Sequence, residues 1–155
     1  MSLIKDKIED IVLIPCSGAE YHGELARQVA IHLEEKSTIS TISSLNCMTI
    51  FLKNVILKKE SMVEIIKNHL KHLNIIIING CRTACASEIY SYLGIVPDLI
   101  ISVQDIIPKH HLNLNDLKHF ENVPKLSEIT KEDIKKVSDY ILNKLYEQLN
   151  YEMFP

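Results

Sequence analysis

Four cysteines are the residues of this 155-residue chain that could most readily do chemistry. They are Cys16, Cys47, Cys81 and Cys85. The last two lie in the stretch IIIINGCRTAC, residues 75–85, where an aliphatic run ends abruptly at Asn-Gly. Thiolates bind zinc, and they also carry redox and nucleophilic chemistry. Under reducing conditions, grouped cysteines more often serve metal or redox chemistry than structural disulfides.

Segments with the pattern of β-strands precede three of these cysteines. Aliphatic, β-branched runs are typical of strands buried on both faces, and an alternation of β-branched and small residues is typical of a half-buried strand. These patterns predict strands over 11–14, 37–45, 74–78 and 98–103. Helical spacing of apolar residues, with capping residues, predicts helices over 21–35, 48–58, 61–73, 83–93 and 130–149. Residues 104–129 have no readable pattern.

The alternation of strands and helices predicts a single α/β domain over residues 1–155. We expect a small three-layer doubly wound sandwich with a mostly parallel sheet of about four strands. The carboxyl ends of parallel strands meet at one edge of the sheet, which is where ligand crevices form. Because Cys16, Cys47 and Cys81 each follow a predicted strand, the topology would bring them together as a cysteine cluster at this edge.

The spacing of Cys81 and Cys85 adds a second indication of metal binding. Residues four apart on a helix share one face, with side chains about 5–6 Å apart, so both sulfurs could reach one ion. The helix N-terminus would also favour the thiolate of Cys81. Four thiolates around a divalent ion leave a negative charge, which Arg82 and the turn amides around Gly18 and Gly80 could offset. Gly80 itself is expected to provide a tight turn or a close approach.

With these motifs the chain resembles the DGC-domain family. The similarity rests on "IPCSG" near the N-terminus, on Cys47, and on "IIIINGCRTACA" after a strand, and it extends from Val12 to about Val103. The family is named for a central Asp-Gly-Cys motif and is inferred to bind zinc through four cysteines. The resemblance therefore implies one zinc ion held by all four cysteines of this chain. The chain has Asn79 where the name implies Asp, which removes a carboxylate that could have supported the ligands.

Other readings of the same residues stay open. A lone cysteine is usually a core residue. A second function class is a thiol redox or metal-transfer protein that uses the same cysteines. A third is an enzyme with a cysteine nucleophile, for example at Cys16 in a phosphate-binding turn, although Arg27 is the first arginine downstream. His22 could replace a sulfur as a ligand, and His22 or His110 could act as a base. His110 and His111 follow the fourth predicted strand and could approach the same edge, although a solvated loop is the favoured interpretation of both. Zinc binding ranks first among these functions.

Composition limits the partners that we expect. With 17 basic and 20 acidic side chains the formal charge is −3, and no long basic run indicates nucleic-acid binding. The N-terminal residues lack the pattern of a signal peptide, and no apolar run reaches the length of a membrane span, so we expect a cytoplasmic protein. The metal ion is the expected ligand, and an unidentified protein is a further candidate partner. The sequence names neither a substrate nor an oligomeric state.

Overall fold

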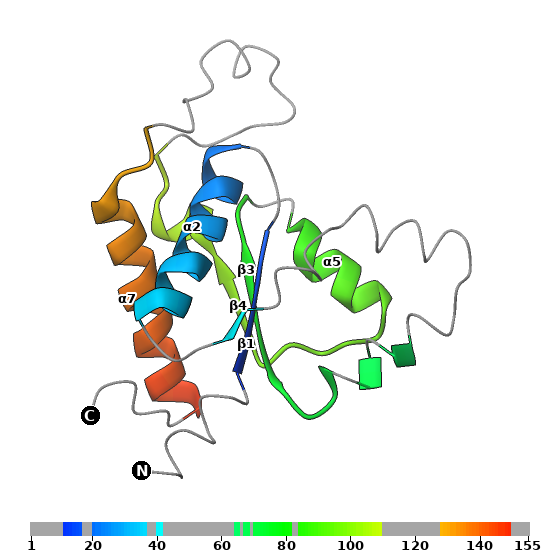
Figure 1. Ribbon diagram of the computed structural model, residues 1–155. Coiled ribbons are helices and arrows are strands. Elements are labelled where there is room, and N and C mark those ends of the chain that lie inside the picture. The colour runs from blue at the N-terminus through cyan, green and yellow to red at the C-terminus, as the bar shows by residue number, and fades with distance from the viewer. Residues whose placement is uncertain are drawn as a thin grey trace, which may run out of the picture.

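The computed structural model describes residues 11–16, 20–36, 40–41, 64–65, 67–68, 70–81, 84–109 and 128–149 (Figure 1). The prediction of an α/β fold with a parallel sheet is confirmed. The strands are β1 (Ile11–Pro15), β2 (Ser40–Thr41), β3 (Asn74–Asn79) and β4 (Leu99–Ser102). The principal helices are α2 (Tyr21–Lys36), α5 (Cys85–Tyr92), α6 (Val103–Ile106) and α7 (Lys131–Leu149).

The strands are ordered β2-β1-β3-β4, and every neighbouring pair is parallel. From β1 the chain moves to β2 on one side, and β3 and β4 then continue on the other side of β1. The direction of winding therefore reverses between β1 and β3. In open α/β sheets this reversal opens a crevice at the carboxyl ends of the two strands, where ligands bind.

Some predicted elements have different bounds or lie outside the described residues. The strand predicted over 37–45 is described only at Ser40–Thr41, and the helix predicted over 48–58 lies entirely outside. Within the helix predicted over 61–73, residues 64–65, 67–68 and 70 are helical. The helix predicted to begin at Thr83 begins at Cys85 instead.

Helices cover both faces of the sheet (Figure 1). Neighbouring residues of a strand point to opposite faces, so each strand contributes apolar side chains to both cores. One core cluster joins α2 and α7 to the sheet, and its strand residues are Ile11, Leu13, Ile76, Ile78, Leu99 and Ile101. The other cluster joins Ala86 and Tyr90 of α5 to Val12, Ile14, Ile75 and Ile77. Almost all of these strand side chains are at most 4% exposed, which explains why their sequences read as unbroken aliphatic runs.

Among the described helices, none combines the length and the apolar character needed to cross a membrane.

Candidate functional site

Three of the four cysteines lie where β1 and β3 end. Cys16 follows β1 directly, and its backbone N–H donates to the carbonyl oxygen of Ile78 in β3 at 2.8 Å. Cys81 is separated from the end of β3 only by Gly80, and Cys85 is the first residue of α5. These cysteines therefore stand at the reversal point of the sheet, as the strand pattern predicted. Cys47 lies outside the described residues.

The Cys85 thiol lies within electrostatic reach of Cys16 and Cys81. Partial burial of its sulfur raises the pKa of the Cys85 thiol, although the residue as a whole is exposed, and the neighbouring Cys16 and Cys81 raise this pKa further. This effect on Cys85 agrees with the position of the three cysteines at the carboxyl ends of β1 and β3. Cys16 and Cys81 are half-buried and Cys85 is exposed. Within the described part of the chain, however, no three His, Cys, Asp or Glu side chains are arranged so that they could hold a metal ion together.

Cys81 and Cys85 do not share a helical face, so the sequence-based account of this pair was wrong. Ala84 has a left-handed backbone, with φ 51° and ψ 43°, which interrupts the helix immediately before Cys85. The Ala84 N–H donates to the carbonyl oxygen of Cys81 at 3.1 Å, so a backbone hydrogen bond links Cys81 to the residue that precedes Cys85. The first helical position belongs to Cys85 rather than Cys81. Its pKa is nevertheless raised, because burial and the neighbouring thiols outweigh the backbone hydrogen bond that lowers it.

Gly80 provides the close approach that was one of its two predicted roles. A Cβ added there would lie 2.6 Å from both the Cα and the amide nitrogen of Gly23, and 2.8 Å from the carbonyl carbon of His22. Among the described glycines, only Gly94 has a positive φ. Gly80 does not, so its role is not to form a left-handed turn. The end of β3 thus rests directly against the first turn of α2.

Asn79, the last residue of β3, is a site residue whose role the sequence did not reveal. Its side chain is buried and faces the first turn of α5. Asn79 Nδ2 donates to the hydroxyl oxygen of Ser87 at 2.6 Å, and the Ser87 N–H donates to Asn79 Oδ1 at 3.3 Å. Ala84 stands at the N-cap position and makes no side-chain cap. Alanine is a poor N-cap residue, so Ala84 before the helix was the one feature of the sequence that could have indicated a cap from another element.

His22 is not directed at the cysteines. The ring is completely buried, and its Nε2–H donates to the carbonyl oxygens of Ile107 and Lys109, each at 2.9 Å. Its Nδ1 lies 3.4 Å from Glu20 Oε2. Both ring nitrogens therefore face acceptors elsewhere, which does not support His22 as a metal ligand or as a base for a thiol. His110 and His111, the other histidines considered for this edge, lie outside the described residues.

Glu20 and His22 form an ion pair at the start of α2, in which His22 is buried and Glu20 is partly exposed. The Glu20 carboxylate accepts the backbone N–H groups of His22, at 3.0 Å, and of Gly23, which caps the helix. Burial alone would lower the pKa of His22, but Glu20 and the two carbonyl oxygens raise it overall. Burial alone would raise the pKa of Glu20, but the hydrogen bonds from His22 and Gly23 lower it overall. The arrangement therefore favours an imidazolium beside a carboxylate.

This ion pair predicts a pH-dependent contribution to stability. The folded pKa of His22 lies above its ordinary value of 6.5, so its contribution is fully present below that pH and is lost as the pH rises through the folded pKa. The folded pKa of Glu20 lies below 4.5, so its contribution is present above that pH and is lost on acidification through the folded pKa. We expect His22→Gln to destabilise the protein more at about pH 6 than at about pH 9.

Urea unfolding of the parent and the variant at both pH values measures this difference. His72→Gln is the matched control, because His72 is exposed. A cost of His22→Gln that is the same at both pH values would contradict the imidazolium assignment.

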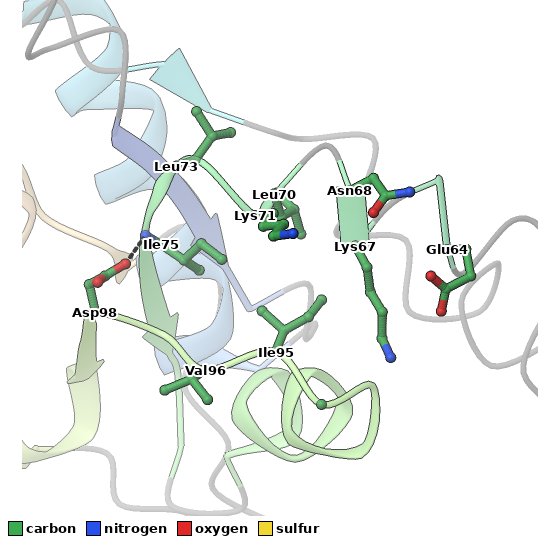
Figure 2. A pocket seen from close by; sticks show the side chains of 11 residues that line it. Glu64, Lys67, Asn68, Leu70, Lys71, Leu73, Ile75, Ile95, Val96 and Asp98 are labelled. Atoms are coloured by element: carbon green, nitrogen blue, oxygen red, sulfur yellow. Dashed lines mark hydrogen bonds between the residues drawn. The ribbon is translucent and has the colours of Figure 1, made fainter.

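A separate cavity of about 450 Å³ lies at the amino edge of the sheet, away from the cysteines (Figure 2). Lys67 and Leu70 line one side of it, and Ile95 and Val96 line the other. Asp98 at one end accepts the backbone N–H of Ile75 at 2.8 Å, so this carboxylate is already used to join β3 to the start of β4. The cavity lining contains no cysteine, and it is not part of the thiol site.

Comparison with known proteins gives one match. The family model described as DGC domain matches residues 12–141, a span that includes all four cysteines, the reversal point of the sheet and most of α7. No curated protein and no solved structure matches the chain. The resemblance carried by the cysteine motifs is thereby confirmed, and the chain belongs to the DGC domain family.

Proposed function

We propose that this protein binds zinc through Cys16, Cys47, Cys81 and Cys85. The observation that supports this most directly is the topology: Cys16 and Cys81 follow the neighbouring parallel strands β1 and β3, and Cys85 begins α5 four residues after Cys81. Thiolates are suitable donors for zinc, and four of them satisfy its preferred coordination number. The described thiols would close around the ion only together with Cys47.

The fold supports a role for zinc beyond folding. Apolar clusters on both faces of the sheet give the chain a core that does not depend on the metal, in contrast to small zinc fingers. The cysteines also lie at the edge where open α/β sheets bind ligands. When bound, the ion would supply positive charge and Lewis acidity there. The exposed Cys85 would leave it accessible to an incoming ligand.

The second candidate function is metal transfer or thiol–disulfide exchange. It is favoured by the same exposed thiol, because Cys85 can be reached from solvent while two other thiols stand nearby. In the exchange, Cys85 would attack an external disulfide, and a neighbouring cysteine would then displace the mixed disulfide. Two protein thiols become a disulfide while the external disulfide is reduced to two thiols. A cysteine-nucleophile enzyme receives no such support, since His22 faces away from the thiols.

Native mass spectrometry of protein purified without added metal tests the proposal. We expect about one zinc ion per chain, and we expect the thiols to react with a titrating reagent only after chelation. A protein without bound metal and with all four thiols reactive would overturn the zinc assignment. A metal-free protein with a disulfide between Cys81 and Cys85 would instead support thiol exchange.

A further inference from the structure

We propose that Asn79 is a positioning residue for the cysteine pair, because its side chain fixes the start of α5, and with it Cys85, relative to Cys81. The inference deepens the proposed metal site and rests on that function for its biological meaning. Its structural content, the placement of one thiol against the other, can be measured without zinc.

The two hydrogen bonds of Asn79 connect the sheet to the third residue of α5. Asn79 belongs to β3 and pairs in register with Ser102 of β4, so its backbone is held by the sheet. Its buried side chain makes both contacts to Ser87, one to the hydroxyl and one to the backbone N–H. The N–H of the third helical residue is one that a capping side chain normally satisfies. Asn79 therefore caps α5 from the neighbouring strand.

This cap matters for the thiols because of the backbone of Ala84, which lies between Cys81 and Cys85 in the chain. Ala84 holds a left-handed conformation that is unfavourable for a residue with a Cβ, and such a conformation persists only where its surroundings impose it. One restraint is the hydrogen bond from Ala84 to Cys81, and another is the bond from the Glu88 N–H to the carbonyl oxygen of Ala84. Asn79 adds a restraint from the sheet. Without it, the first turn of α5 can relax together with Cys85.

The alternative is that Asn79 only stabilises a helix. A matched cap on another helix distinguishes the two roles. The Thr130 hydroxyl accepts the backbone N–H of Asp133 at 3.1 Å and so caps α7, which covers the opposite face of the sheet from α5 (Figure 1). Thr130→Ala therefore removes a helix cap without touching the thiol pair. A purely stabilising role predicts the same behaviour for both sites.

Three substitutions test the role of the Asn79 side chain. Asn79→Leu is similar in size and removes both hydrogen bonds. Asn79→Asp keeps the cap, since a carboxylate can accept from both the N–H and the O–H of Ser87. Ser87→Ala removes only the hydroxyl contact and is the milder variant should Asn79→Leu fail to fold.

The measurement uses phenylarsine oxide, whose arsenic forms bonds to two thiols and releases water, and which therefore needs the sulfurs close together. Each variant is made in a background of Cys16→Ser and Cys47→Ser, which leaves Cys81 and Cys85. We expect Asn79→Leu to weaken capture of the arsenical by about tenfold and Ser87→Ala by about threefold. Asn79→Asp should restore capture to within about twofold of the background, and Thr130→Ala should leave it unchanged.

Capture by Asn79→Leu or Ser87→Ala as tight as that of the background would overturn the inference. So would an equal loss in Thr130→Ala, or a background protein that captures no arsenical. Zinc titration of the variants with all four cysteines present separates the two proposals. If the parent binds no zinc but the arsenical results hold, the metal function fails and the positioning role of Asn79 stands.

Discussion

Replacing Gly80 with alanine is expected to destabilise the protein by about 2–3 kcal/mol, because it overpacks a contact between two backbones. The added Cβ would lie 2.6 Å from the Cα and the amide nitrogen of Gly23. Neither atom can rotate away as a side chain could, so the end of β3 and the first turn of α2 must separate. Cys81 follows Gly80 directly, and we therefore expect the variant to weaken metal binding as well.

Gly94→Ala is the matched control for this prediction. Gly94 has φ +74°, so alanine there is strained, but the nearest atom to its added Cβ is the flexible Lys67 Nζ at 3.7 Å. We expect this variant to lose about 1 kcal/mol from backbone strain alone. Urea unfolding of both variants gives the comparison. A loss for Gly80→Ala no greater than that for Gly94→Ala would show that the contact with Gly23 is not rigid.

Cysteine-to-serine substitutions are expected to have the largest effects on zinc binding. Cys16→Ser and Cys81→Ser should each weaken zinc affinity by more than about 100-fold, because serine does not supply a thiolate and both positions are half-buried. Cys85→Ser should cost less, about tenfold or more, because water can occupy the ligand position of an exposed residue. The helix N-terminus does not distinguish Cys81 from the other cysteines, since the helix begins at Cys85.

Competition with a zinc-binding dye measures the affinities of the three variants. Ser91→Ala is a suitable control, because Ser91 is exposed on the same helix as Cys85. The zinc affinity of the Ser91→Ala variant should equal that of the parent protein. If Cys85→Ser also binds zinc as tightly as the parent, Cys85 is not a ligand, and the coupled thiols do not form a shared metal site.

The sequence by itself determined the elements with strong local patterns. The run predicted as a strand over 11–14 became β1, the periodic segment 21–35 became α2, and the capped segment 130–149 became α7, each within about one residue of its bounds. Burial of one face of a helix, or of a whole strand, sets the spacing of apolar residues along the chain. This spacing can be recognised without knowing which elements the segment packs against. The same patterns placed three cysteines after strands, and those that the structure describes lie at the expected edge.

Only the tertiary structure decided how that edge is built. His22 donates to the carbonyl oxygen of Ile107, 85 positions away, and the local sequence does not indicate this hydrogen bond. The sequence indicated that a side chain at Gly80 would be blocked. That Gly23 is the residue in contact with it follows from the packing of α2 against β3. The left-handed Ala84 and its cap from Asn79 have the same origin. Each depends on contacts between separate elements, and such contacts override the local preferences that sequence patterns record.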